Sequence, residues 1–239
     1  LLSTQVFFAQ NGFEKGNALY EKGKYAEAVG AYESVLGANL QSPELYFNLG
    51  NAYYKWNKVA PAIYYYEKAL VLNPKDNESL NNLKFAHKRT IDEIKVIPKV
   101  GFEKLMRDFT GIYNYNTWGW ITIGFATLFL LFFIGYYFSE NAVYKRIFFF
   151  GMFVALVLLL LAVSSAIFEK SHFDSEKPAI VSAEMANVKS EPRDGGKPLF
   201  LLHEGTKVYV EEIIGKWKKI QLTDGTEGWI ESSAIKEVK

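Results

Sequence analysis

The chain has 239 residues, of which 49% are hydrophobic and 22% charged, and its formal net charge is +1. This balance gives no global electrostatic basis for nucleic-acid binding, so nucleic acid is excluded as a partner. The sequence has no cysteine, which excludes disulfides, thiol catalysis and Cys-ligated metals.

Residues 1–10, LLSTQVFFAQ, form a short apolar segment. They resemble the tail of a secretory signal, with Ala9-Gln10 as the cleavage point. The alternatives are the end of an N-terminal membrane helix and a frayed hydrophobic terminus. We favour export, which would place the next residues outside the cytoplasm.

Residues 11–95 repeat with a period of 34 residues, the period of tetratricopeptide (TPR) units. The step relates small residues to small residues and aromatics to aromatics: Gly16 to Gly50, Asn17 to Asn51, Ala28 to Ala62, and Tyr32 to Tyr66. Small side chains let two antiparallel helices approach, and the tyrosines fill the remaining gap. The pattern resembles TPR arrays, which implies an all-α stack of helical hairpins. We expect a capping helix from Glu78 to about Ile94 to close the stack.

The resemblance to TPR domains implies a concave groove lined by the first helix of each unit. Carried over by position, the groove residues that would bind a partner are Phe13, Asn17, Tyr20, Phe47, Asn48, Asn51 and Tyr54, with Glu21 and Lys55 beside them. Aromatic rings and side-chain amides suit an extended or helical protein segment. Two alternatives stay open: the chain's own segment 96–115 fills the groove, or the tyrosines only pack between units.

Two uncharged, strongly apolar runs, 117–138 and 147–168, are each long enough to cross a membrane as a helix. A connector, 139–146, joins them. In the juxtamembrane segment 96–116, the residues Phe102, Leu105, Met106 and Phe109 recur at helical spacing. They indicate a short interfacial helix or, equally, a face that packs under the repeats.

Lys145 and Arg146 in the connector point it to the cytoplasm, so both soluble regions are expected in the periplasm of a bacterial inner membrane. Neither run contains an ionisable residue, which argues against a transporter and favours an anchor. Ala162 and Ala166 offer a small-residue pair on which other membrane helices could pack.

After a linker, 169–178, residues 179–239 change to short β segments with glycine-bearing turns. Asp224-Gly225 is a hairpin signal. The order of Glu204-Gly205, Trp217 and Gly228-Trp229-Ile230 resembles a bacterial SH3 domain, which implies a small all-β barrel. We expect Trp229 in its core and Trp217 on its ligand face.

No catalytic motif accompanies these features, so an enzyme is not expected. The histidines, at positions 87, 172 and 203, lie in separate regions and lack metal-ligand spacing. The sequence therefore predicts no catalytic residue, no metal and no cofactor.

The whole-chain order of TPR units, two spans and an SH3-like domain resembles the BatE family of the Bacteroides aerotolerance operon. The resemblance implies a membrane-anchored periplasmic scaffold in a multi-protein complex. Its implied partners are other membrane proteins, namely Bat proteins with von Willebrand A domains, a MoxR-type AAA ATPase on the cytoplasmic side, and membrane lipid. The alternative function is peptidoglycan binding or sensing through the SH3-like domain.

Overall fold

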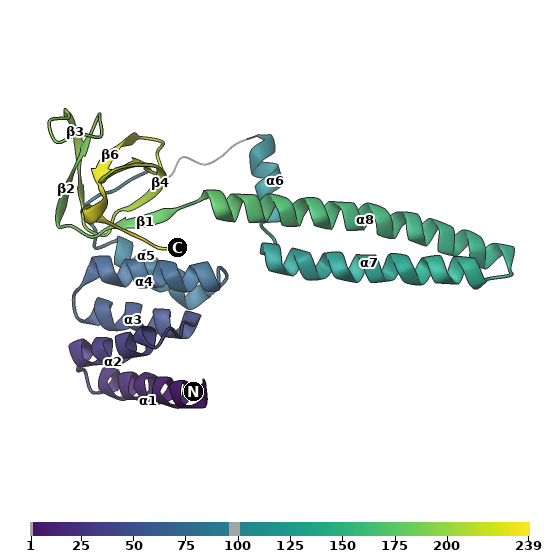
Figure 1. The fold of residues 1–239 in the computed structure, drawn as a ribbon, viewed down its shortest axis with the longest axis horizontal. Helices are drawn as coiled ribbons and strands as arrows, with labels where there is room; N and C mark the ends of the chain where they lie inside the picture. The colour runs from purple at the N-terminus through teal and green to yellow at the C-terminus, as the bar shows by residue number, and fades with distance from the viewer. Residues whose placement is uncertain (1, 96–100) are drawn as a thin grey trace. The chain divides into compact units, whose positions relative to one another are not determined.

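The computed structural model describes residues 2–95 and 101–239, which form two compact units. The first unit combines the described residues up to 95 with Lys177–Lys239, and the second takes residues 101–176. Within the first unit, residues 2–95 are here named the repeat domain and Lys177–Lys239 the β-domain. The second unit is named the hairpin unit. The predicted multidomain fold of helical repeats, two apolar helices and an antiparallel sheet is confirmed (Figure 1).

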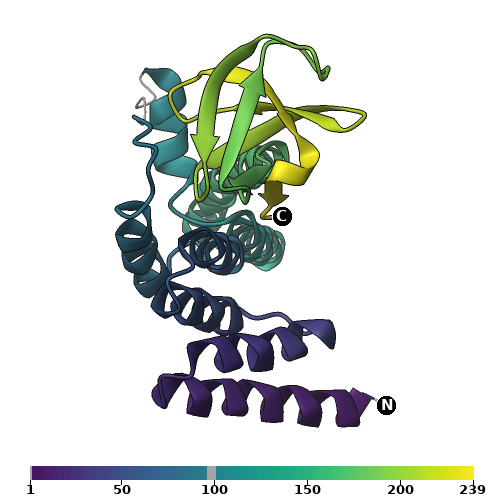
Figure 2. The ribbon, with the colours of Figure 1, turned by 90° about the vertical axis from the view of Figure 1, so that its left-hand side faces the viewer.

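The repeat domain is a stack of antiparallel helices, coloured purple to blue in Figures 1 and 2. Ser42 and Asp76 begin the third and fifth helices, because each side chain accepts a hydrogen bond from a backbone N–H at 3.1 Å. Asn57, with φ 65°, makes the tight turn inside the second repeat. The helices are α1 (Leu2–Glu21), α2 (Tyr25–Gly37), α3 (Pro43–Lys55), α4 (Val59–Leu72) and α5 (Asn77–His87).

Two glycines set the spacing inside the repeats. A Cβ at Gly16 would lie 2.3 Å from the ring of Tyr32, and a Cβ at Gly50 would lie 2.6 Å from the ring of Tyr66. Both tyrosine rings are almost completely buried. The two matched contacts give the sequence period its physical cause, since the ring occupies the space that a larger residue would need.

Two details of the repeat domain differ from expectation or stay untested. The capping helix ends at His87 rather than near Ile94, because the hydroxyl of Thr90 donates to the His87 carbonyl and the chain turns away toward the β-domain. α1 runs without a break through Ala9-Gln10. Whether residues 1–10 belong to an export signal stays a prediction.

The β-domain is an antiparallel sheet in the order β3-β2-β6-β5-β4-β1-β7. Figure 2 shows its strands, green to yellow, curving around a shared interior. The predicted turn at Asp224-Gly225 joins β5 to β6, with Gly225 at φ 83°. The strands are β1 (Pro178–Val181), β2 (Met185–Lys189), β3 (Pro198–His203), β4 (Lys207–Ile214), β5 (Trp217–Gln221), β6 (Glu227–Glu231) and β7 (Ile235–Glu237), with a 3-10 turn at Ser232–Ala234 before the last.

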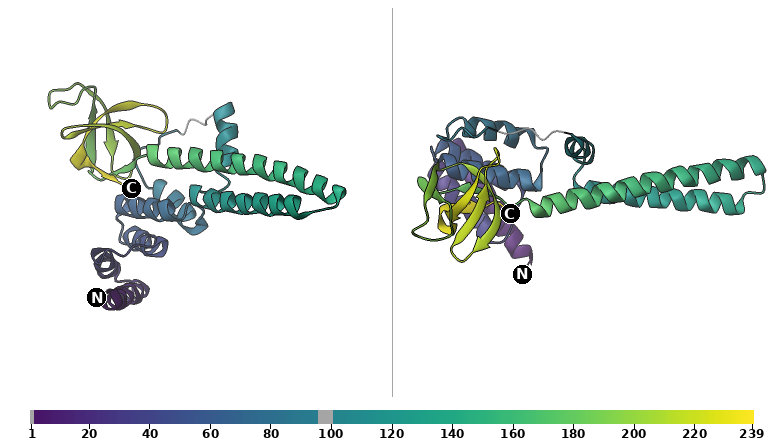
Figure 3. Two further views of the ribbon diagram at one scale, coloured as in Figure 1. Left: turned by 45° about the vertical axis from the view of Figure 1, so that its right-hand side comes forward. Right: turned by 90° about the horizontal axis from the view of Figure 1, so that it is seen from above.

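The hairpin unit contains α6 (Phe102–Thr110), α7 (Tyr115–Phe138) and α8 (Ala142–Ser175). α7 and α8 run side by side in both views of Figure 3. Their packing is reciprocal: the ring of Phe148 lies against Gly135, and the ring of Phe132 lies against Gly151. By length and composition, both helices could cross a membrane.

The boundaries of this unit differ from the predicted ones. α8 already begins at Ala142 within the expected connector, and it continues to Ser175 through most of the expected linker, since no proline or glycine stands between Phe168 and Pro178. Ala162 is buried inside the unit, so this half of the predicted small-residue pair is not open to another helix. Residues 96–100 of the predicted juxtamembrane segment lie outside the described residues.

Candidate functional site

Two adjoining pockets form a groove along the repeat domain, and we name them together the groove. The larger, about 250 Å³, is lined by residues of α1, α3, α4 and α5. The smaller, about 160 Å³, is lined by residues of α1, α2 and α3. Tyr20 and Asn51 line both pockets, so the two adjoin each other. Five predicted groove residues line them, namely Asn17, Tyr20, Asn48, Asn51 and Tyr54, and so do the neighbouring Glu21 and Lys55.

A hydrogen-bond network in the smaller pocket is centred on Asn17. Its side-chain oxygen accepts from the hydroxyl of Tyr32 at 2.7 Å and from the amide of Asn48 at 3.1 Å. The network ties α1 to α2 and α3. It fixes which end of the Asn17 amide faces the groove.

The same network recurs one repeat later. The side-chain oxygen of Asn51 accepts from the hydroxyl of Tyr66 at 2.7 Å and from the amide of Asn82 at 2.8 Å. Each residue stands 34 positions after its counterpart, which is the TPR period. The groove therefore presents two equivalent polar rungs, one per repeat.

Both tyrosine hydroxyls act as permanent donors near neutral pH. Burial, with smaller contributions from Tyr20 and Glu21, raises the pKa of Tyr32 to about 12. Burial likewise raises the pKa of Tyr66 above its ordinary value of 10.0. Because neither phenol ionises, the oxygens of Asn17 and Asn51 stay occupied.

Within the part of the chain that the structure describes, each rung leaves one amide NH₂ group and one amide oxygen unpaired. Among the described residues, the NH₂ groups of Asn17 and Asn51 have no hydrogen-bond partner, and neither do the side-chain oxygens of Asn48 and Asn82. A peptide backbone offers the complementary pair, one carbonyl and one N–H per residue. The unpaired groups of the groove are therefore complementary to a peptide main chain, whatever its side chains.

Phe13 and Phe47 do not line either pocket. Phe13 packs on Tyr32 with ring centroids 5.9 Å apart, and Phe47 packs on Tyr66 at 6.2 Å. They are partly buried against the core of the repeats. Both phenylalanines thus pack on the tyrosines of the rungs without lining either pocket, and their part in binding a partner stays a prediction.

Several residues of the groove were not among those predicted from the sequence to bind a partner. Asn82 and the exposed Phe85, both on α5, line the larger pocket. The guanidinium of Arg89 lies 5.0 Å from the ring centre of Tyr54. Extending the 34-residue step once more, from Asn48 to Asn82 and from Asn51 to Phe85, would have found the two α5 residues.

The tryptophans of the β-domain reverse the burial that we expected. Trp217 is 4% exposed, whereas Trp229 is only partly buried. The ammonium groups of Lys189 and Lys216 lie 4.7 and 5.6 Å from the ring centre of Trp217. Since two cations and the sheet cover this ring, Trp217 offers a ligand little surface.

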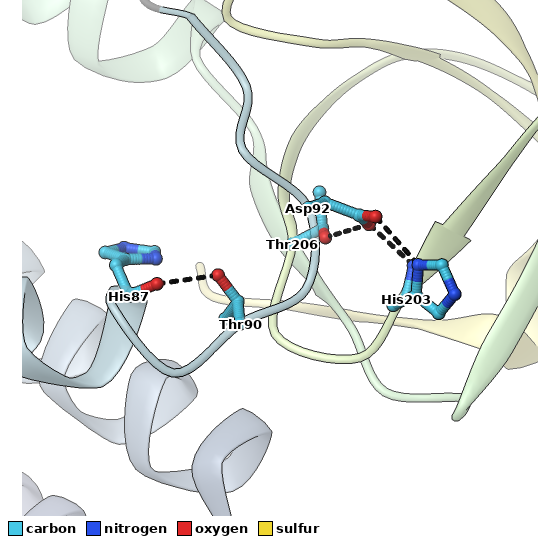
Figure 4. Close-up of polar contacts among 5 residues, drawn as sticks. All are labelled: His87, Thr90, Asp92, His203 and Thr206. Atoms are coloured by element: carbon cyan, nitrogen blue, oxygen red, sulfur yellow. Dashed lines mark hydrogen bonds and ion pairs between the residues drawn. The ribbon is translucent and has the colours of Figure 1, made fainter.

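A polar junction joins the repeat domain to the β-domain within their shared unit (Figure 4). Asp92 accepts from the backbone N–H of His203 at 2.6 Å and from the hydroxyl of Thr206 at 2.6 Å, and its second oxygen lies 2.7 Å from the His203 ring. Burial alone would raise the pKa of Asp92, but these hydrogen bonds together lower it below the ordinary range.

The rest of the junction combines an ion pair with apolar contacts. Glu67 of α4 is 7% exposed, and both its oxygens lie 2.8 Å from the ammonium group of Lys207. Ile180 and Val238 of the β-domain belong to the hydrophobic core of the repeats. The β-domain thus covers the end of the helical stack.

The described residues contain no cluster of three or more histidine or acidic side chains placed to hold a metal. His203 contacts Asp92. Burial, opposed in part by Glu67, lowers the pKa of His87, which keeps it neutral at pH 7. Within these residues, the groove and the junction are the main polar constellations.

Comparison with known proteins identifies the helical part. A family model described as tetratricopeptide repeat matches residues 13–77. No curated protein matches the chain. A solved structure, the first TPR of Spaghetti (RPAP3) bound to an HSP90 peptide SRMEEVD, is similar at 25% identity and a TM-score of 0.24, over 34% of this chain and 91% of that one. Residues 13–77 of this chain are therefore tetratricopeptide repeats, the repeats of protein-interaction scaffolds.

Proposed function

We propose that the chain is a membrane-anchored scaffold whose groove binds a segment of another membrane protein. The observation that carries this proposal is the pair of rungs. Each has an unpaired amide donor on one asparagine and an unpaired oxygen on the next, among the described residues. Aromatic side chains of Tyr20, Tyr54 and Phe85 lie beside them and would bury apolar groups of the bound segment.

The junction supports a topology for this anchor. The repeat domain and the β-domain belong to one compact unit, although the hairpin unit lies between them in sequence. If α7 and α8 cross a membrane, both parts of that unit must lie on the same side, which two crossings provide. Lys145 and Arg146, near the start of α8, favour the cytoplasm for the connecting end. We therefore propose that the repeat domain and the β-domain face the periplasm of a bacterial inner membrane.

The order of the parts suggests the partners. TPR repeats, two apolar helices and a sheet domain that we propose to be SH3-like resemble the BatE family of the aerotolerance system. On that resemblance, we propose Bat proteins with von Willebrand A domains as membrane partners and a MoxR-type AAA ATPase on the cytoplasmic side.

The test is extraction in mild detergent of a stoichiometric complex with other membrane proteins. Tyr54→Ala and Phe85→Ala remove aromatic walls of the larger pocket. If these are hot spots, each should weaken assembly by about 2 kcal/mol, roughly thirtyfold in Kd. Trp56→Ala is the matched control, because Trp56 is an exposed aromatic outside the pockets. A complex that survives both groove changes would contradict the proposal.

The alternative function, peptidoglycan binding through the β-domain, rests on the order of sequence features. Its expected ligand residue, Trp217, is nearly buried. The same preparation distinguishes the two functions, since a peptidoglycan binder would sediment with isolated cell wall and would do so equally well with Tyr54→Ala. We favour the scaffold because the groove has polar groups that are unpaired among the described residues, whereas the expected ligand residue Trp217 is 4% exposed.

A further inference from the structure

α6 carries an apolar face that the described residues leave open. Phe102, Leu105 and Phe109 lie on one side of this helix and are 77%, 68% and 47% exposed. Lys104 and Asp108 lie on the other side. Among the described helices, α6 is the most strongly amphipathic. Its short length and mixed faces differ from the uniformly apolar α7 and α8.

The end of α6 is tied to both long helices of its unit. The indole N–H of Trp118, at the start of α7, donates to the backbone carbonyl of Thr110 at 2.7 Å. The hydroxyl of Thr110 donates to the carboxylate of Glu169 on α8 at 2.5 Å. Thr110 is fully buried, and the rings of Phe109 and Tyr113 pack on Trp118 at 5.8 and 5.6 Å. We name these contacts the Thr110 lock.

The lock fixes the level of α6 along the hairpin. Residues 147–168 of α8 contain no charge, and Glu169 is the first charged residue after them, followed by Lys170. Thr110 therefore sits where α8 changes from an apolar to a charged surface. Trp118 and Tyr113 lie beside this point of α8. Indole and phenol rings are enriched at the boundary between lipid and water.

We infer that α6 lies in the headgroup region of the bilayer, with its Phe102–Leu105–Phe109 face in contact with lipid acyl chains. This inference rests on the proposed membrane anchor. A lipid surface is the occupant that fits, because Thr110 holds the end of α6 at Glu169, where the uncharged stretch of α8 ends. On the opposite side, Lys104 meets water and headgroup phosphates. α6 is thus an interfacial helix that sets the depth of the hairpin in the bilayer.

The absence of cysteine makes a depth measurement direct. Single cysteines replace Phe102 and Leu105 on the apolar face, Lys104 and Asp108 on the polar face, and Leu130 in the middle of α7. Each full-length variant is labelled with an environment-sensitive fluorophore and reconstituted in vesicles of phosphatidylcholine and phosphatidylglycerol. Doxyl-labelled acyl chains report lipid contact, and iodide in the buffer reports water contact.

The inference predicts a pattern with helical periodicity. Probes at 102 and 105 should be quenched by shallow doxyl lipids and shifted to the blue, and probes at 104 and 108 should be quenched by iodide. The probe at 130 should be quenched by deep doxyl lipids. Quenching at 130 with none at 102 and 105 would overturn the inference while leaving the anchor intact. No lipid quenching at 130 would contradict the anchor itself.

A second variant tests the lock. Trp118→Phe keeps an aromatic ring but removes the N–H that binds the Thr110 carbonyl. We expect the probes at 102 and 105 to lose part of their lipid quenching, while the probe at 130 keeps its value. Unchanged quenching at all three positions would show that lipid contact alone positions α6, and would overturn the role of the lock.

Discussion

Glu33 and Glu67 occupy the same position in the two repeats, yet Glu33 is exposed and Glu67 is buried. Glu33 accepts a hydrogen bond from Tyr53, whereas Glu67 pairs with Lys207 of the β-domain. Next to them, Gly30 of the first repeat has open space around it, while Tyr64 of the second is buried under the cation of Lys236, 4.2 Å from its ring centre.

The groove side shows no such divergence. The rungs centred on Asn17 and Asn51 have the same donors and nearly the same distances in both repeats. The two copies therefore share the surface that lines the groove and differ on the surface that meets the β-domain. In each repeat, the surface that lines the groove and the surface opposite the β-domain are therefore constrained separately.

The largest loss of stability is expected at the glycine–tyrosine contact that both repeats share. Gly50→Val and Gly16→Val each drive a side chain into a buried tyrosine ring, so each should destabilise the protein by about 3 kcal/mol. Thermal unfolding of the full chain in detergent measures the loss. Gly30→Ala is the control and should be neutral or slightly stabilising, since its Cβ meets open space. Equal stability of all three variants would refute the close contact.

The second loss of stability should appear in the second repeat alone. Glu67→Gln removes a buried charge opposite Lys207 and should cost about 2 kcal/mol of stability. Glu33→Gln, at the matched position on the surface, should change stability by less than about 0.5 kcal/mol. Chemical unfolding of both variants gives the comparison. Similar losses in the two would mean that the β-domain does not distinguish the repeats.

The third effect should again be equal in both copies. Tyr32→Phe and Tyr66→Phe each delete the hydroxyl that donates to the central asparagine of a rung. Each should cost about 1 kcal/mol, the usual contribution of one hydrogen bond. A marked inequality in unfolding free energy would show that the rungs are not equivalent.

The smallest effect is a loss of stability of the wild-type chain at acidic pH. The pKa of Asp92 is lowered in the folded chain, so the ionised carboxylate stabilises the junction above its unfolded pKa of about 3.9, and this contribution is lost as the pH falls through the lower folded value. The melting temperature of the full chain should therefore drop below about pH 4. Asp92→Asn should be less stable at neutral pH and show a smaller drop. Parallel pH curves for the two proteins would argue against a linked Asp92.

The sequence predicted the repeated helices and the long apolar helices. The 34-residue step located Gly16, Gly50 and both central asparagines, because the same packing problem is solved twice. The same step grouped Phe13 and Phe47 with them, and these two rings pack on the tyrosines without lining either pocket, since a helix position defines a direction but not the extent of a pocket.

The junction had no sequence signal. Asp92 and His203 are 111 residues apart and belong to segments with different periodicities, so nothing local marks them as partners. The end of α8 was likewise unpredictable from charge, because Glu169, Lys170 and Asp174 are compatible with a solvent-exposed helix. Tertiary contacts determine the junction, and the absence of a helix-breaking residue between Phe168 and Pro178 determines how far α8 extends.

The separation of Asp92 and His203 along the chain also determines an order of assembly. During synthesis the repeats emerge before the hairpin unit and the β-domain emerges after it, so the carboxylate of Glu67 has no access to Lys207 until 140 further residues have been made. The hairpin unit emerges in between, and its insertion into a bilayer would precede closure of the junction. A ribosome stalled before residue 177 would thus leave the last repeat uncovered, a state that chaperones or proteases in the same compartment can recognise.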